Sequence, residues 1–113
     1  MFMTRPFRKK SFTIVRLFSI MAFYVYVIQS EVDNSYYKGF SENPINRLSQ
    51  HNNGECVYTL RKMPWAFVYI EELPTKREAL IRERSLKKYA HAQIEKLILS
   101  NRNCVAFFGS SAG

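Results

Sequence analysis

Cysteine and histidine are scarce in this sequence, with two residues of each type among 113. Cys56 and Cys104 lie far apart, form no CxxC pair and have no cluster of histidines around them. Disulfide-stabilised domains and zinc modules require several such residues at short spacings. The sequence therefore indicates neither a disulfide framework nor a zinc site, and we expect both cysteines to be reduced, inert thiols of a cytoplasmic protein.

A long apolar run is also missing. The longest one, from Leu17 to Ile28, covers about half of the roughly 20 residues that a membrane-spanning helix needs. Arg16 interrupts the basic and apolar N-terminus, and no small-x-small cleavage site follows, which argues against a signal peptide. We expect no stable membrane insertion. Residues 1–20 are interpreted as a flexible basic leader or an over-extended start of translation, and the alternative is an amphipathic anchor on anionic lipid.

Acidic residues are absent before Glu31, so much of the net charge of +8 lies near the N-terminus. Five basic residues precede any acidic one: Arg5, Arg8, Lys9, Lys10 and Arg16. The rest of the chain has a net charge of only about +3. This charge permits a phosphate-bearing partner but does not demand one.

The composition, 47% hydrophobic and 15% aromatic, is that of one globular domain. We expect it to span residues 21–101, followed by a tail, 102–113, without a strong structural signal. The residue pattern predicts strands at 23–29, 36–40 and 66–72. It predicts a helix from Pro44, capped by Ser41 or Asn43, a long helix over 76–90 opened by a Thr75/Glu78 capping box, and a final amphipathic segment. The order β-β-α-β-α-α indicates a small α+β layer fold.

Two residues do not suit the elements that contain them. Gly39 lies inside the second predicted strand, "YYKGFS", where glycine weakens a strand unless the chain bends, bulges or is closely approached. Glu83 falls within the apolar stripe of the long helix, among Ala79, Leu80 and Leu86. A carboxylate that faces inward must be paired or hold a metal. The alternative to a metal is a salt bridge to a nearby arginine.

Arg47 and His51 are four residues apart on the predicted short helix and therefore neighbours on one face. We expect Ile45 and Leu48 to supply that helix's core contacts. Arg47 and His51 would then flank the buried apolar stripe. An arginine binds phosphate bidentately, and a histidine relays protons near neutral pH. The alternative is that both are ordinary surface residues.

Tyrosines follow the two strands of the predicted hairpin. Tyr26 and Tyr37 carry polar tips on neighbouring strands, Tyr24 shares the face of Tyr26, and Tyr36 points to the other side. Taken alone, Tyr26 and Tyr37 are better explained as core tyrosines with their hydroxyls at the rim.

The stretch from Phe23 to about Asn101 resembles the GIY-YIG nuclease domain, particularly the small single-domain bacterial proteins of the UPF0213 or URI-like type. "YVYVI" stands where that family has GIY-x-I, and "YYKG" stands at the YIG element about ten residues later. "NPINRLSQHN" is similar to the family's helix with an arginine and a histidine, and "TKREALIRERSLKKY" to the helix with a metal-binding glutamate. The resemblance implies a small three-stranded antiparallel sheet flanked by helices.

The resemblance also implies an endonuclease that hydrolyses DNA phosphodiester bonds with a divalent metal, Mg²⁺ or Mn²⁺. It assigns the motif tyrosines to Tyr26 and Tyr37, motif backbone positions to Tyr24 and Gly39, the phosphate-binding arginine to Arg47, the helper histidine to His51 and the metal-binding carboxylate to Glu83. Gly39 would leave room for a phosphate. Either tyrosine would be the general base, which requires a pKa lowered from about 10. Tyr24 replaces the first motif glycine, Lys38 the middle residue of the second motif, and the asparagine that some members carry after the glutamate is absent.

No base-reading element such as a helix-turn-helix or zinc finger is evident, so specificity is expected to be weak or directed by nicked, branched or single-stranded DNA, as in repair or recombination. A protein partner would then choose the target. The candidate nucleic-acid contacts are Lys38, Lys62, Arg77, Arg84, Lys87 and Lys88, although charges on a helix often form only a solvated face. The alternative function is a nucleic-acid-binding module with little or no hydrolysis.

Overall fold

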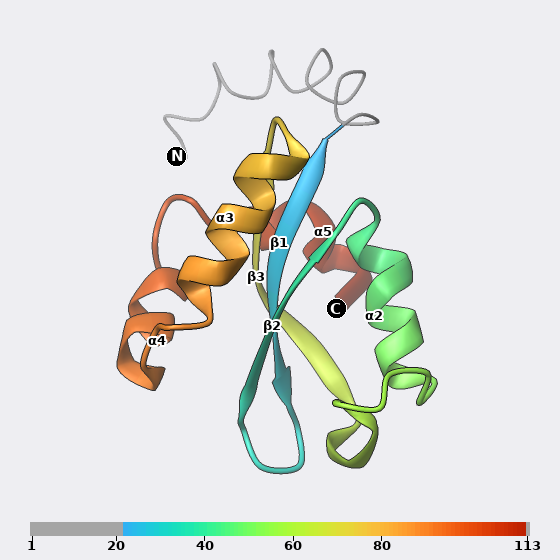
Figure 1. Ribbon diagram of the computed structural model, residues 1–113. Coiled ribbons are helices and arrows are strands. Elements are labelled where there is room, and N and C mark those ends of the chain that lie inside the picture. The colour runs from blue at the N-terminus through green and yellow to red at the C-terminus, as the bar shows by residue number, and fades with distance from the viewer. Residues whose placement is uncertain (1–21, 113) are drawn as a thin grey trace.

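The computed structural model describes residues 22–112, with side chains through Phe108. The interpretations of residues 1–20 lie outside this range. The elements are β1 (Phe23–Ser30), β2 (Tyr36–Ser41), α2 (Pro44–Asn52), a 3-10 turn (Leu60–Lys62), β3 (Trp65–Leu73), α3 (Lys76–Leu86), α4 (His91–Ile98) and α5 (Val105–Ala112) (Figure 1). Within the described part of the chain, no helix is long and apolar enough to cross a membrane.

The three strands form one antiparallel sheet in the order β2-β1-β3. The α+β fold with a three-stranded antiparallel sheet is therefore confirmed. In the register, Tyr26 lies opposite Gly39 on β2 and opposite Ile70 on β3. The central strand β1 is almost wholly buried because neighbours flank it on both sides and helices cover both of its faces.

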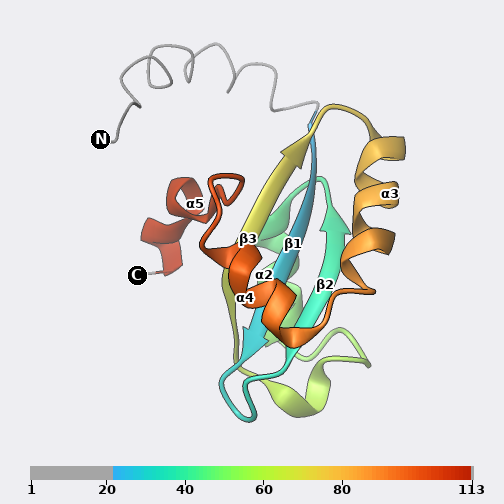
Figure 2. The ribbon, with the colours of Figure 1, turned by 90° about the vertical axis from the view of Figure 1, so that its left-hand side faces the viewer.

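Side chains of β1 alternate between two differently built faces of the sheet. One face, here called the tyrosine face, carries Tyr24, Tyr26 and Ile28 and packs against residues of α2 and α5. The other, the valine face, carries Val25 and Val27 and packs against α3 and α4. Figure 2 shows α3 and α5 on opposite sides of the sheet. Strand alternation thus divides the apolar core into two layers.

Helix starts follow the capping residues in the sequence. The Asn43 side chain accepts a hydrogen bond from Asn46 N at 3.1 Å, and Thr75 accepts one from Glu78 N at 3.1 Å. Of the two caps considered for α2, Asn43 is thus the one used, while Ser41 Oγ accepts from Asn43 N. The predicted long helix is too long: α3 ends at Leu86, and the chain turns through 87–90 into α4.

The segment 102–113 forms more structure than its sequence indicated. Helix α5 packs on the tyrosine face through Val105 and Phe108, and the Phe108 ring meets Tyr24 edge-on with centroids 5.7 Å apart. Asn103 ties the segment to β3, because its amide donates to Val68 O and accepts from Ile70 N. The segment therefore belongs to the folded unit.

Candidate active site

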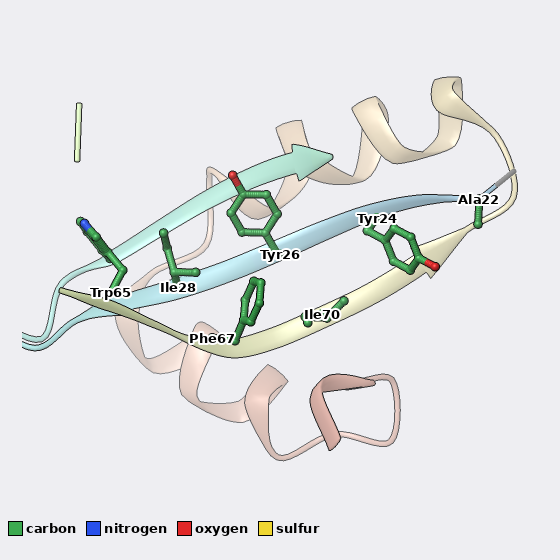
Figure 3. Packing of buried hydrophobic residues seen from close by; sticks show 7 residues of the cluster. All are labelled: Ala22, Tyr24, Tyr26, Ile28, Trp65, Phe67 and Ile70. Atoms are coloured by element: carbon green, nitrogen blue, oxygen red, sulfur yellow. The ribbon is translucent and has the colours of Figure 1, made fainter. Parts of the chain in front are cut away.

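The position of the Tyr26 side chain accounts for the glycine at position 39. The Tyr26 side chain extends from β1 across β2 (Figure 3). A Cβ added at Gly39 would stand 2.5 Å from Tyr26 Cζ and closer still to the hydroxyl oxygen. Real carbon atoms do not approach so closely, so only glycine lets the ring lie against this strand. The close approach inferred from the sequence is present, and in this structure the Tyr26 ring makes it.

A chain of buried polar groups begins at the Tyr26 hydroxyl. That hydroxyl lies 2.9 Å from His51 Nε2, and His51 Nδ1 lies 2.8 Å from Thr59 Oγ1. All three residues are buried, with 1% of Tyr26 and 0% of His51 and Thr59 exposed. The surface alternative for His51 is therefore wrong. Burial, reinforced by the charge of Arg47, lowers the pKa of His51 to about 4, so the ring is neutral at pH 7.

Both motif tyrosines have raised pKa values. Burial raises the pKa of Tyr26, against the opposing effects of a hydrogen bond with Arg47 and of its charge. Burial also raises the pKa of Tyr37, with further contributions from Cys56 and from the charge of Glu83. Neither hydroxyl thus meets the expectation of a lowered pKa. A base role here requires that the tyrosine passes its own proton on as it accepts another.

Arg47 extends from α2 over the two tyrosines. Its guanidinium acts as a hydrogen-bond partner of Tyr26, its charge lowers the pKa of Tyr37, and its NH1 group donates to Gln50 Oε1 at 2.7 Å. The side chain is half-buried. Ile45 was expected to supply core contacts for this helix but is 49% exposed, whereas Leu48 packs against the tyrosine-face cluster.

Tyr37 is the more accessible of the two tyrosines and packs between other rings. Its ring centroid lies 5.1 Å from that of His51 and 6.3 Å from that of Trp65. Tyr36 points to the valine face as predicted, where its ring lies 4.6 Å from that of His91. Tyr24 is buried against Phe108 and takes part in the core. The structure thus brings together Tyr26, Tyr37, Arg47 and His51 and leaves Tyr24 apart.

Glu83 approaches this group from α3. Its side chain is 19% exposed and pairs with Lys87 Nζ at 3.3 Å, so the partner is a lysine one turn away and not an arginine. Its charge is a small contribution to the raised pKa of Tyr37, after burial and Cys56. Across the described residues, no group of three or more His, Cys, Asp or Glu side chains could hold a metal. A single accessible carboxylate still suits Mg²⁺, which keeps most of its waters.

Cys56 is a member of this group that the sequence did not reveal. Burial raises the pKa of its thiol, but contacts with the Thr59 hydroxyl, with the amides of residues 58 and 59 and with the charge of Arg47 outweigh burial and lower the pKa. The thiol also contacts the Tyr37 hydroxyl. Neither cysteine forms a disulfide within the described part of the chain. Cys56 therefore lies beside Tyr37 at the candidate site.

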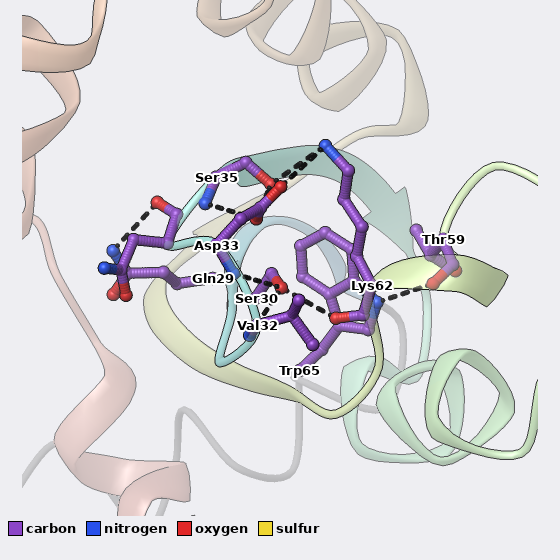
Figure 4. A network of polar contacts seen from close by, with 9 residues as sticks. Gln29, Ser30, Val32, Asp33, Ser35, Thr59, Lys62 and Trp65 are labelled. Atoms are coloured by element: carbon purple, nitrogen blue, oxygen red, sulfur yellow. Dashed lines mark hydrogen bonds and ion pairs between the residues drawn. The ribbon is translucent and has the colours of Figure 1, made fainter.

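The predicted nucleic-acid contacts do not gather around the tyrosines. Lys38 lies opposite Val27 and is half-buried on the valine face. Lys62 closes the β1–β2 turn, since its Nζ pairs with Asp33 at 3.1 Å and donates to Ser35 Oγ (Figure 4). Lys87 pairs with Glu83. The remaining candidates are exposed on α3 or just after it: Arg77, Arg84 and Lys88.

The comparison with known families agrees with this geometry. A family model described as the GIY-YIG catalytic domain matches residues 22–96. The chain belongs to the GIY-YIG family. All the site residues described above lie within the match, and α5 lies beyond it.

Similar GIY-YIG chains occur in several bacteria. A UPF0213 protein of Streptococcus pneumoniae (strain TIGR4) is 33% identical over 93 residues, which cover 80% of this chain and 93% of that protein. UPF0213 protein CPE1444 of Clostridium perfringens is 40% identical over 78 residues, 68% of this chain and 83% of that protein. The solution NMR structure of UPF0213 protein BH0048 from Bacillus halodurans shares 28% identity with a TM-score of 0.48, covering 73% of this chain and 87% of that one.

Membership of this family has general consequences for activity. GIY-YIG domains are nuclease domains that act on nucleic acid and generally use a divalent metal. The names of the relatives state no substrate.

Proposed function

We propose that this protein is a metal-dependent endonuclease that hydrolyses DNA phosphodiester bonds with weak or structure-directed specificity, of the kind used in repair or recombination. The observation that carries the proposal is that Tyr26, His51 and Arg47 lie together beside Tyr37. The charge of Glu83 also acts on the Tyr37 hydroxyl. Phosphodiester hydrolysis needs a proton acceptor, a cation for the phosphoryl oxygens and a site for metal.

Arg47 would bind the phosphate and stabilise the charge that develops on it. Its described partners are a neutral amide and tyrosine hydroxyls, so its positive charge is not neutralised by a carboxylate among the described residues. Oriented cationic donors in such a site are typically worth about 10²–10³ in rate. Movement of Arg47 toward the phosphate would also free one lone pair of the Tyr26 oxygen for the attacking water.

Tyr26 is the tyrosine that we propose as base. As the water attacks phosphorus, its proton would pass to the Tyr26 oxygen while the Tyr26 proton passes to His51 Nε2, 2.9 Å away. This transfer requires no free tyrosinate, consistent with the raised pKa of Tyr26 caused by burial. Glu83 would hold the divalent metal, Mg²⁺ or Mn²⁺, which when bound supplies charge stabilisation at the phosphate and the leaving oxygen.

A nucleic-acid-binding module on the same fold, acting through a protein partner, is the second candidate. The raised pKa values of both tyrosines favour it, because they oppose formation of a strong base. The two functions differ in their dependence on metal. A binding module should retain its affinity in chelator and after loss of the Glu83 charge, whereas a nuclease should lose cleavage in both cases.

Cleavage of a panel of labelled substrates would test the proposal. The panel contains duplex, single-stranded, nicked, flapped and branched DNA, with one RNA, each incubated with Mg²⁺, Mn²⁺ or chelator. Wild type is compared with Glu83→Gln, which removes the charge but keeps the shape. Glu78→Gln is the matched control, because Glu78 is exposed in the first turn of the same helix.

Cleavage by wild type and Glu78→Gln in metal, with at least a hundredfold loss in Glu83→Gln, would support the nuclease, and the preferred DNA would indicate its substrate. Binding without cleavage of any DNA, by protein shown to be folded, would overturn the nuclease in favour of the binding module.

A further inference from the structure

The buried hydroxyl of Tyr26 needs an acceptor for its proton. Among the residues that the structure describes, two groups are hydrogen-bond partners of its oxygen: the Arg47 guanidinium, which only donates, and His51 Nε2, which accepts when it carries no proton. Tyr26 is 1% exposed, so bulk water is not a ready substitute. A buried hydroxyl without an acceptor is unfavourable, and hence the Tyr26 hydroxyl donates to Nε2.

The other ring nitrogen of His51 then carries the imidazole proton. Neutral imidazole has one N–H, so a bare Nε2 requires a protonated Nδ1. Nδ1 lies 2.8 Å from Thr59 Oγ1, which accepts this proton. The hydroxyl proton of Thr59 is in turn directed to Cys56, whose carbonyl oxygen lies 3.4 Å away and whose thiol also contacts this hydroxyl. Every donor from Tyr26 to Thr59 therefore has an acceptor, and the hydrogen bonds all point from Tyr26 toward Cys56.

The backbone around Thr59 holds its hydroxyl in place. Thr59 N donates to Cys56 O at 3.2 Å, which closes a turn over residues 56–59. Thr59 O accepts from the Trp65 indole at 2.9 Å and from Lys62 N at 3.2 Å. Thr59 is also fully buried and has a β-branched side chain, which restricts its rotation. The acceptor presented to His51 is therefore rigid.

We propose that Thr59 is a positioning residue that fixes His51 in the Nδ1-protonated tautomer, so that Nε2 faces Tyr26 as a proton acceptor. The catalytic consequence rests on the proposed function. In the step described above, the bond from water to its proton breaks as the Tyr26 O–H bond forms, and the original Tyr26 O–H bond breaks as an Nε2–H bond forms. His51 becomes a cation whose Nδ1–H still donates to Thr59. The water oxygen bonds to phosphorus as the bond from phosphorus to the leaving 3′ oxygen breaks, and the leaving oxygen keeps that electron pair and takes a proton from solvent.

The tautomer can be measured directly by nitrogen-15 NMR of the imidazole, without reference to cleavage. Wild type and Thr59→Ser should show a protonated Nδ1 and a bare Nε2 at His51, because serine keeps the hydroxyl. Thr59→Val removes the acceptor at nearly constant shape and should make the Nε2-protonated form the major one. Tyr26→Phe, which removes the opposite partner, should leave the wild-type tautomer in place.

A bare Nδ1 in wild type would overturn the proposal, as would a wild-type tautomer in Thr59→Val. A shift in Tyr26→Phe equal to that in Thr59→Val would also overturn it, because Tyr26 would then be the residue that sets the tautomer. If Thr59→Val does not fold, wild type, Thr59→Ser and Tyr26→Phe still decide the question.

Cleavage gives a second readout. Thr59→Val should lower kcat at least tenfold with KM nearly unchanged, and Thr59→Ser should restore kcat to within about threefold of wild type. Equal kcat in wild type and a tautomer-shifted Thr59→Val would overturn the catalytic consequence. Absence of cleavage in wild type would refute the proposed function. The role of Thr59 in fixing the His51 tautomer would then be tested by NMR alone.

Discussion

Each face of the sheet holds a buried tyrosine with an arginine nearby, but the partners of the hydroxyl and of the arginine differ between the two faces. On the valine face, the Tyr69 hydroxyl donates to Glu71 Oε1 at 2.6 Å, and Arg82 Nε pairs with the same oxygen at 2.9 Å. On the tyrosine face, the Tyr26 hydroxyl meets a neutral imidazole, and the nearby arginine has no carboxylate partner among the described ion pairs.

Charge balance therefore distinguishes a structural tyrosine from a candidate catalytic one. Around Tyr69 the opposite charges of Glu71 and Arg82 compensate each other, so no ligand is needed to balance the charge, although one buried guanidinium nitrogen of Arg82, NH2, has no hydrogen-bond partner among the described residues. Around Tyr26 no carboxylate of residues 22–108 forms an ion pair with Arg47, so its charge suits an incoming phosphate. The variants below compare a change on the tyrosine face with a matched change on the valine face.

Arg47→Met should have the largest effect on function. We expect cleavage to fall by about 10²–10³, because the phosphate loses its cation, while the free energy of unfolding changes little. Single-turnover cleavage and urea unfolding would measure the two quantities. A loss of stability that matches the loss of activity would contradict the contrast between the faces.

Arg82→Met should show the opposite pattern. Removal of one partner leaves the largely buried Glu71 carboxylate without its cation, which we expect to cost about 3 kcal/mol of stability. Activity per folded molecule should be unchanged. Adding Glu71→Gln to this variant should recover part of the loss, as measured by urea unfolding. Full activity loss in folded Arg82→Met would show that the valine face also serves the chemistry.

Gly39→Ala and Val27→Ile each add one carbon, on the tyrosine face and the valine face respectively. Both should cost about 1–3 kcal/mol by overpacking. Only Gly39→Ala should also lower cleavage, because the added methyl would push the Tyr26 ring away from His51. Thermal unfolding and cleavage would be measured for both variants. Equal cleavage rates for the two folded variants would contradict a role for the Tyr26 position.

The pH dependence of stability should be the smallest effect. The pKa of His51 is about 4 in the folded chain against 6.5 for the free side chain, so between these values the unfolded chain binds more protons. Stability should therefore fall by about 2 kcal/mol as the pH drops from 6.5 to 4. Urea unfolding across this range would measure the slope. His51→Gln should flatten it, because it removes the titrating imidazole.

Local patterns made much of the fold and part of the site predictable from the sequence. The β-branched and aromatic runs marked the strands, the caps at Asn43 and Thr75 marked two helix starts, and Gly39 marked a close approach. These signals are local, because strand alternation and capping act within a few residues.

The remaining features depend on contacts between distant parts of the chain. Thr59 and Cys56 lie in a turn without periodicity, and they matter only because folding brings that turn against His51 and Tyr37. Burial of His51 likewise depends on a hydrogen bond to a residue 25 positions earlier. Helix α5 has only 8 residues, and its position depends on Asn103 reaching β3, 33 to 35 residues back.

Asn103 also affects how many backbone hydrogen-bonding groups of the sheet edge are accessible to other molecules. β3 is an edge strand, and such strands expose hydrogen-bonding groups on which a strand of a second chain can assemble. Here Cys104 N donates to Ile70 O, while the Asn103 amide engages Ile70 N and Val68 O. The C-terminal segment thus blocks intermolecular sheet extension at the middle of β3, so it guards against aggregation as well as covering the core.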